Sequence, residues 1–262
     1  MKISKLLAGL LVGFYAAAGW AVDNSIYIDQ AGSGATVTIN QDGAGNRVKG
    51  ILPNGNAGQQ TDPAKINGDN MTVTVDQIGP NNVLALGIQS TTAAGSTATS
   101  VTYNVTGGNN TGYINLNSDG AGTNSSTTLN IQQTDGGNNA NVRVLGSQNT
   151  INVTQTGGAS GFVTSVNANE TVQTVNTSGG TNNVVNSTME SSKGSLQLTA
   201  VGSSNNFTVA QTGSAGAVGH QTVLDFNGSG NQVNVTQGGS IDTTVNIKSA
   251  GSNNAFTVTT KN

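Results

Sequence analysis

The sequence contains no cysteine, one histidine, three prolines and few charged or aromatic residues. Without cysteine, neither a disulfide framework nor a thiolate metal site can form. Charged residues make up 8% of the chain, against about 25% in typical globular proteins. The formal net charge of −3 and the pI near 4.8 give no basic surface for nucleic acid. We therefore expect no nucleic-acid partner and no disulfide in the fold.

The first 21 residues have the pattern of a secretory signal peptide. Lys2 and Lys5 precede an apolar run from Leu6 to Ala18, and Gly19-Trp20-Ala21 forms a small-x-small cleavage signal. The run is shorter than the roughly 20 residues that span a bilayer, and no later segment is apolar enough to do so. We expect a signal peptide over residues 1–21, a mature repeat domain over residues 22–262, and no membrane span.

What the chain does have is a recurring pattern of glycine followed three residues later by asparagine. Each asparagine opens a segment in which every second residue is apolar or Gln; from Asn205 these are Phe207, Val209 and Gln211. Side chains in a strand alternate between faces, so each segment predicts a half-buried strand. The asparagines of the pattern are Asn46, Asn82, Asn110, Asn149, Asn182, Asn205, Asn231 and Asn254.

A second alternating strand leads into each glycine, so one repeat reads strand, arc, strand, arc. The spacing between successive asparagines varies from 23 to 39 residues. The longer spacings predict insertions at the arcs, most clearly in residues 50–68 and 119–126. A single unit cannot bury its apolar face alone, so the units must stack. The sequence therefore predicts an all-β solenoid with two strands per rung and about eight rungs, capable of forming amyloid cross-β.

The inward side chains of this solenoid include amides as well as apolar groups. A buried amide without partners costs a few kcal/mol. Identical amides stacked from rung to rung can hydrogen-bond along the axis, which removes that cost and sets the register. We expect such ladders at Gln30, Gln41, Asn46, Gln77, Asn82, Asn149, Gln155, Asn205, Gln211, Asn231, Gln237 and Asn254.

Two segments, QDGAGN at residues 41–46 and QIGPNN at residues 77–82, resemble the Gln-x-Gly-x-x-Asn core of curlin repeats. The similarity covers most of residues 24–262, although other units replace the Gln, for example by Val105, Ala200 or Phe226. The resemblance implies export across the outer membrane of a Gram-negative-type cell and assembly into curli-like amyloid fibres for adhesion and biofilm matrix. It also implies a nucleator subunit and an outer-membrane export machinery as partners.

Both ends of the expected solenoid favour self-association. The segment NNAFTVTTKN stops partway through a rung, and NSIYIDQAG begins a rung directly after the expected signal peptide. Soluble β proteins usually protect such edges with charge, proline or a covering element. We therefore expect a head-to-tail homopolymer that grows by strand addition.

The chain is poor in groups that could carry out catalysis. A nucleophile–base–acid set would need His220, which we expect on the surface or facing an arc. Asp225 and Asp242 lie one rung apart but on different strands, and the acidic fragments near Asp42 and Asp119 lack the tandem nine-residue period of calcium-binding β-rolls. We expect no catalytic residue, no metal site and no cofactor.

Two other functions remain open at this point. A monomeric or surface-attached adhesin could bind carbohydrate or a host surface through its insertion loops, and parallel β-helices also include enzymes that act on polysaccharides. Insertions in the first two thirds of the chain favour the adhesin, whereas the open ends favour the fibre.

Overall fold

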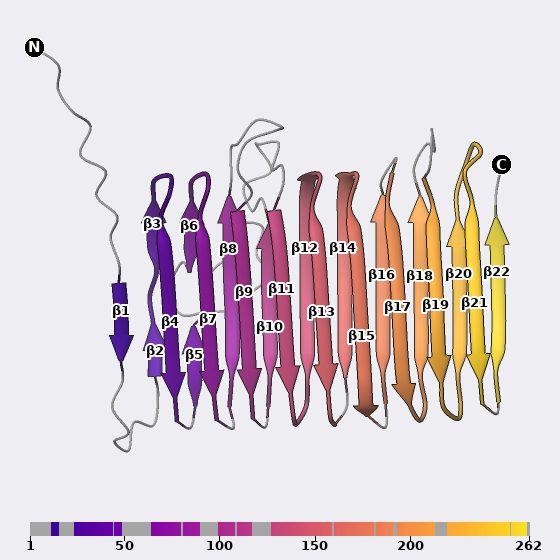
Figure 1. The fold of residues 1–262 in the computed structure, drawn as a ribbon, viewed down its shortest axis with the longest axis horizontal. Helices are drawn as coiled ribbons and strands as arrows, with labels where there is room; N and C mark the ends of the chain where they lie inside the picture. The colour runs from indigo at the N-terminus through magenta and orange to yellow at the C-terminus, as the bar shows by residue number, and fades with distance from the viewer. Residues whose placement is uncertain are drawn as a thin grey trace, which may run out of the picture.

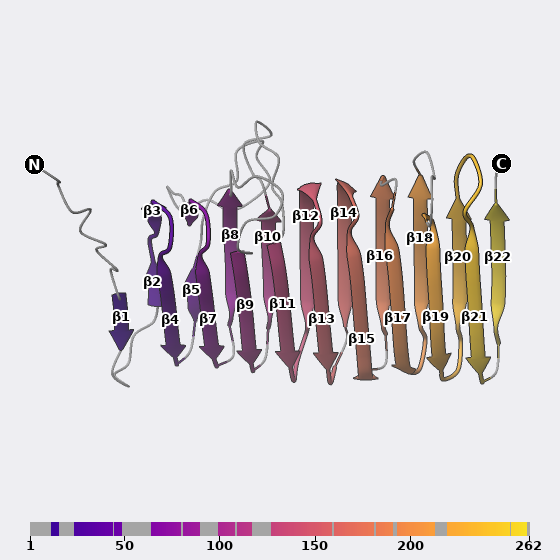
Figure 2. The ribbon, with the colours of Figure 1, turned by 45° about the horizontal axis from the view of Figure 1, so that its top comes forward.

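The structure of the protein is a computed structural model. The structure describes residues 12–15, 24–43, 45–48, 64–79, 81–89, 99–107, 109–116, 127–158, 160–180, 182–190, 193–212, 219–251 and 253–260. All regular elements in these residues are β-strands, and they form two parallel sheets whose strands run side by side along one rod (Figure 1). The view in Figure 2 shows the same order of strands from β1 to β22.

The first sheet, which we call sheet A, has ten strands in this order: β1 (Val12–Tyr15), β4 (Thr36–Asp42), β7 (Thr72–Ile78), β9 (Thr99–Thr106), β11 (Thr127–Thr134), β13 (Thr150–Thr156), β15 (Val172–Gly180), β17 (Ser195–Gly202), β19 (Gln221–Asn227) and β21 (Thr244–Ala250).

Sheet B has twelve strands: β2 (Asn24–Ile26), β3 (Asp29–Ala31), β5 (Asn46–Val48), β6 (Lys65–Asn67), β8 (Val83–Gln89), β10 (Thr111–Leu116), β12 (Asn139–Ser147), β14 (Gly161–Asn169), β16 (Val184–Glu190), β18 (Asn206–Thr212), β20 (Gln232–Gln237) and β22 (Ala255–Thr260).

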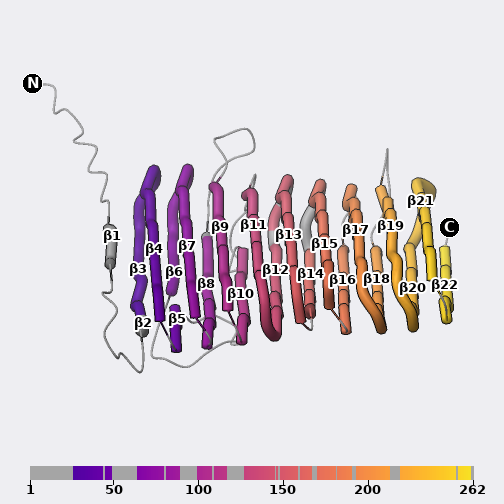
Figure 3. Tube along the Cα trace, turned by 60° about the horizontal axis from the view of Figure 1, so that its bottom comes forward, coloured from indigo at the N-terminus to yellow at the C-terminus, as the bar shows by residue number. Residues whose placement is uncertain are grey.

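The chain alternates between the sheets, so one sheet B segment and the following sheet A strand make one rung. The predicted architecture, an all-β solenoid with two strands per rung, is confirmed. The described strands form nine complete rungs, from β2, β3 and β4 to β20 and β21, with β1 and β22 as half rungs at opposite ends of the rod (Figures 1 and 3). The nine rungs agree with the predicted number of about eight, although two units depart from the glycine–asparagine pattern.

The core lies between the two sheets and consists of columns of aligned side chains. In sheet A, the parallel register aligns Ile39 with Val75, Val75 with Tyr103 and Tyr103 with Ile131, and all four side chains are buried. Sheet B contributes Phe207 in the column of Val185 and Val233. Because side chains alternate between faces, the apolar residues predicted to face inward do so.

The insertion expected in residues 50–68 does not lie at an arc. Residues 49–63 are outside the described residues, but β6 (Lys65–Asn67) belongs to the segment 50–68 and is part of sheet B. Both β5 and β6 pair with β8, at Val83–Leu84 and at Gly87–Gln89 respectively. The insertion therefore divides what would be one strand of sheet B into β5 and β6. The prediction that it lies at an arc was wrong. The other expected insertion, 119–126, lies outside the described residues between β10 and β11.

Most of the expected signal peptide lies outside the described residues, but Val12–Tyr15 forms β1. This strand pairs in parallel with β4, Val12 opposite Val37 and Tyr15 opposite Asn40. The division into a leader over residues 1–21 and a mature chain stays a prediction.

Glycines at the arcs from sheet A to sheet B stack directly on one another. A Cβ atom on Gly228 would lie 1.5 Å from the backbone oxygen of Gly202, and one on Gly202 would lie 2.3 Å from that of Gly180. Both residues also have positive φ, 148° and 157°, which favours glycine. The glycine of the repeat is therefore required by contact between rungs as well as by the turn.

Candidate functional site

The candidate functional site is the set of amide ladders that runs through the solenoid. Gln155 shows how one amide is used. Its Nε2 donates a hydrogen bond of 2.7 Å to Oε1 of Gln133 in the neighbouring rung and one of 2.8 Å to the backbone oxygen of Gly161 across the arc. One bond joins neighbouring strands of sheet A, and the other closes the arc that leads from sheet A to sheet B. The Gln of the repeat thus fixes both the stacking and the turn.

The same arrangement occurs in the first rungs of sheet A. Nε2 of Gln77 donates to Oε1 of Gln41 at 2.7 Å, and both side chains are buried. The hydroxyl of Tyr103 in the next rung donates to Oε1 of Gln77 at 3.0 Å. Burial raises the pKa of the Tyr103 phenol far above its ordinary value, so this donor keeps its proton across the physiological range.

A shorter glutamine ladder lies in sheet B near the C-terminal end. Nε2 of Gln237 donates to Oε1 of Gln211 at 3.3 Å and to the backbone oxygen of His220. Gln211 in turn lies 3.9 Å from the sulfur of Met189, where the ladder stops. The glutamines therefore form separate ladders on the two sheets.

The asparagine ladder is longest over the last three complete rungs and the final half rung. Nδ2 of Asn183 donates to Oδ1 of Asn205 at 2.8 Å, Asn205 donates to Asn231 at 2.9 Å, and Asn231 donates to Asn254 at 2.8 Å. All these bonds point from the N-terminal toward the C-terminal end of the rod. Asn205 and Asn231 also donate to the backbone oxygen of the glycine three residues earlier, at 3.0 and 2.8 Å. The Gly-x-x-Asn spacing thus closes the arc while the ladder joins the rungs.

The asparagine ladder is broken in the first half of the solenoid. Asn110 donates to Oδ1 of Asn138 at 3.0 Å. In the rung that follows Asn138, however, Ser160 occupies the ladder position in place of an asparagine. Asn82 is fully buried and neither of its amide atoms has a hydrogen-bond partner. Asn46 donates to the backbone oxygens of Gln41 and Ile78. Among the described residues, the asparagine ladder is therefore continuous only toward the C-terminal end.

The predicted grouping of the ladder residues needs one correction. Asn149, Ile151, Val153 and Gln155 all face inward, as predicted. They lie in or next to β13 of sheet A, however, whereas Asn205 and Gln211 lie at β18 of sheet B. Gly146 and Asn149 therefore mark an arc from sheet B to sheet A, opposite to the arcs of the other units. Local turn chemistry is similar at both arcs, so the sequence pattern could not distinguish them.

Three ladder positions escaped the sequence pattern. Asn183 is buried and Asn182 is exposed, because a register shift between Ser178 and Gly180 displaces the unit by one residue. Asn138 follows Asp135 where other units have glycine; Asp135 adopts φ 61°. Ser160 replaces the asparagine in its unit. The units that contain Asn138 and Ser160 both retain the glutamine of the Gln-x-Gly-x-x-Asn motif, so this glutamine could have identified these two units.

Two predicted ladder residues lie at the open ends. Gln30 in β3 is aligned with Ile66, so it has no glutamine neighbour within the chain. Asn254 accepts a hydrogen bond from Asn231, but its side chain is exposed. The remaining ten residues of the predicted set are buried: Gln41, Asn46, Gln77, Asn82, Asn149, Gln155, Asn205, Gln211, Asn231 and Gln237.

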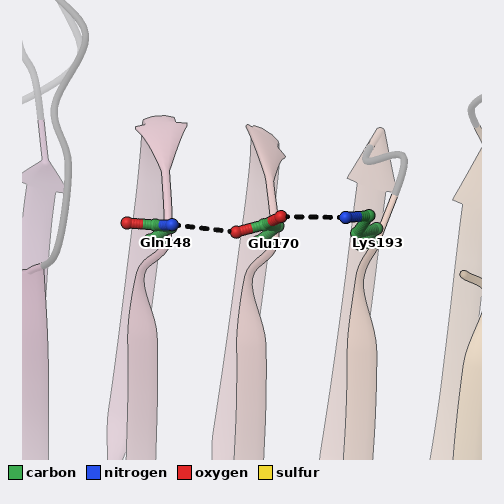
Figure 4. Close-up of polar contacts among 3 residues, drawn as sticks. All are labelled: Gln148, Glu170 and Lys193. Atoms are coloured by element: carbon green, nitrogen blue, oxygen red, sulfur yellow. Dashed lines mark hydrogen bonds and ion pairs between the residues drawn. The ribbon is translucent and has the colours of Figure 1, made fainter. Parts of the chain in front are cut away.

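A second, exposed ladder runs along the arcs from sheet B to sheet A. Nε2 of Gln148 donates to Glu170 at 3.0 Å, and Nζ of Lys193 forms an ion pair with the other oxygen of Glu170 at 3.1 Å (Figure 4). The hydrogen bond from Gln148, followed by the Lys193 contact, lowers the pKa of the Glu170 carboxyl. Because these groups are exposed, we expect their contribution to stability to be small.

The structure places the potentially reactive residues His220 and Asp225 in different environments. His220 is buried rather than on the surface, and both ring nitrogens lack hydrogen-bond partners. Asp225 forms an exposed ion pair with Lys248 at 3.3 Å. Within the part of the chain that the structure describes, there is no cluster of three or more His, Cys, Asp or Glu residues that could hold a metal ion. Nor do these residues contain a helix with the length and apolarity needed to cross a membrane.

Comparisons with protein-family models, with curated proteins and with solved structures find no match to this chain. What is shown is a parallel β-solenoid with two sheets and stacked buried amides. Membership of the curlin family stays a prediction from the sequence resemblance.

Proposed function

We propose that this chain is a structural subunit of an extracellular, curli-like amyloid fibre that serves cell adhesion and biofilm matrix. The observation that carries the proposal is the continuation of the inter-rung amide ladder up to Asn254 in the last half rung. Each asparagine of this ladder donates to the asparagine of the next rung, so a further rung beyond Asn254 would give its amide the same bond. A second copy of the chain is the simplest source of that rung.

The partners follow from the same proposal. The main partner is another copy of the subunit, added head to tail. The resemblance to curlin repeats supports a nucleator subunit and an outer-membrane export machinery as additional partners, and secretion to the cell surface as the localisation. The role is mechanical, with no catalytic residue, metal or cofactor.

Dilution of denatured residues 22–262 into buffer tests this function. Thioflavin T fluorescence should show a lag and a growth phase, and electron microscopy at the plateau should show unbranched fibres that seed fresh protein. A β-rich monomer that remains soluble and does not bind thioflavin T would contradict the fibre.

The second candidate is a monomeric or surface-attached adhesin that binds carbohydrate or a host surface. A hollow of about 500 Å³ on the outer face of sheet A favours it, because it is lined across three rungs by polar side chains, among them Asn40, Asp42, Asp76, Asn104 and Thr106, and by the exposed Ile78. Amides and carboxylates of this kind can bind sugar hydroxyls. A glycan array probed with the soluble monomer distinguishes this candidate from the fibre.

A further inference from the structure

The C-terminal end of the rod exposes residues that belong to the core. Phe256 and Val258 in β22 are each 46% exposed. Their register partners in β20, Val233 and Val235, are 4% and 0% exposed. Phe256 and Val258 face inward like these partners and lack only a following rung. No charged residue or proline occurs in Ala255–Thr260 to block strand pairing.

The N-terminal end is open on the same sheet. Among the described strands, β2 pairs with β5 and β3 pairs with β6, in both cases on one side only. Ile26 is aligned with the buried Val48, and Gln30 with the buried Ile66. Ile26, Ile28 and Gln30 are themselves only half buried. This edge therefore also presents inward-facing residues without a covering rung.

We propose that β22 of one copy pairs in parallel with β2 and β3 of the next copy. This joint rests on the proposed fibre function and specifies its polarity and register. A single register places Asn254 on Asn24, Phe256 on Ile26, Val258 on Ile28 and Thr260 on Gln30. Every column of sheet B then continues across the joint, with apolar residues on apolar residues and polar residues on polar ones.

The direction of the asparagine ladder makes this joint polar. Asn254 accepts from Asn231 and uses one amide hydrogen on the backbone oxygen of Gly251 at 2.9 Å. An amide nitrogen carries two hydrogens, and the second has no acceptor among the described residues. In the proposed register it points toward the strand position of Asn24 in the next copy, which the backbone pairing of Asn24 with Asn46 places on the asparagine column. Two C-terminal ends facing each other would instead oppose two donors, which disfavours head-to-head stacking.

The two sheets do not meet at the joint in the same way. Sheet A begins with β1 and ends with β21, whereas sheet B begins with β2 and ends with β22. In a head-to-tail stack, β22 of one copy and β1 of the next would complete one shared rung. Removal of the expected signal peptide would take β1 away and leave sheet A one strand short at the joint. The contact between mature copies is therefore carried by sheet B.

Two blocked variants of residues 22–262 test the joint. The first carries Phe256→Lys and Val258→Lys, and the second carries Ile26→Lys and Ile28→Lys. A lysine facing the apolar columns should lower seeded elongation by more than about tenfold, since leaving its charge unpaired in the interface costs several kcal/mol. The matched control carries Thr257→Lys and Thr259→Lys, which point outward from the same strand and should keep elongation within about twofold.

Mixing the two blocked variants tests the polarity. Each variant should remain a monomer alone, and the mixture should form a one-to-one heterodimer by native mass spectrometry, because each supplies the end that the other lacks. Homodimers of the variant blocked at Ile26 and Ile28 would overturn the polarity. If the unmodified chain forms fibres and both blocked variants do so equally well, the joint is wrong while the fibre function stands. If the unmodified chain never assembles, both fail.

Hydrogen exchange on fibres of unmodified residues 22–262 provides a test without substitutions. Amides of β22 should become as protected in the fibre as those of β20. The amides of β21 that point away from β19 should stay exchangeable, because sheet A lacks a strand at the joint. Equal protection of β21 and β22 would overturn the proposed joint.

Discussion

Replacing Asn205 by alanine tests how much the amide ladder stabilises the solenoid. Asn205 is fully buried and takes part in three hydrogen bonds. It accepts from Asn183 at 2.8 Å, donates to Asn231 at 2.9 Å, and donates to the backbone oxygen of Gly202 at 3.0 Å. The substitution removes all three and leaves each partner with one bond fewer in a site that water does not reach.

The size of the effect follows from these contacts. A hydrogen bond between neutral groups contributes about 1 kcal/mol net, and a buried polar group left without its partner costs about 1–3 kcal/mol. Asn231 keeps its own bond to Gly228, and Asn183 keeps a long contact of 3.5 Å with the backbone oxygen of Val201, which limits the loss. We expect Asn205→Ala to lower the free energy of unfolding by about 3–5 kcal/mol.

Guanidinium unfolding of residues 22–262, followed by circular dichroism below the concentration at which fibres form, measures this loss. The matched control is Asn206→Ala, because Asn206 is the next residue along the strand and is exposed. The control should change the free energy of unfolding by less than about 0.5 kcal/mol. If Asn205→Ala lowers stability no more than the control does, the ladder does not stabilise the fold and the account of the buried amides is wrong.

Two further predictions concern the arcs and the core. Gly228→Ala should prevent folding or displace a rung, because its Cβ would lie 1.5 Å from a backbone oxygen; Gly239→Ala, where nothing lies within 4 Å, should leave the circular dichroism spectrum and stability unchanged. Burial raises the pKa of Tyr103, so its contribution to stability is complete below the ordinary tyrosine value of about 10 and is lost as pH rises toward the folded-state pKa. Tyr103→Phe should therefore make unfolding less sensitive to pH above about 10, and an unchanged alkaline dependence would contradict this.

Much of the fold follows from local sequence. The alternation Phe207, Val209, Gln211 predicts a strand and an inward face, and the structure confirms both. Such patterns predict the inward face because the alternation of side chains between the two faces is set within each strand, independently of its neighbours. The spacing of the Gln-x-Gly-x-x-Asn motif is also set by local structure, because the Gln155 amide reaches the carbonyl of Gly161 within one arc.

The position of each strand in the stack could not be predicted in the same way. The segments after Asn149 and Asn205 have nearly the same pattern, yet they lie on opposite sheets. An alternating strand fits either sheet equally well, because both bury one face against the same core. His220, which we expected on the surface or facing an arc, is buried, and this burial likewise depends on neighbouring rungs.

The sequence by itself determined that the chain forms strands, which side chains face inward, and where glycine and asparagine close arcs. Only the tertiary structure decided which amides meet, where the ladders break and which half rung each end exposes. The reason is that strand and turn preferences are set by neighbouring residues, whereas ladder partners such as Gln41 and Gln77 are 36 residues apart in the chain. Such contacts exist only once the rungs have stacked in register.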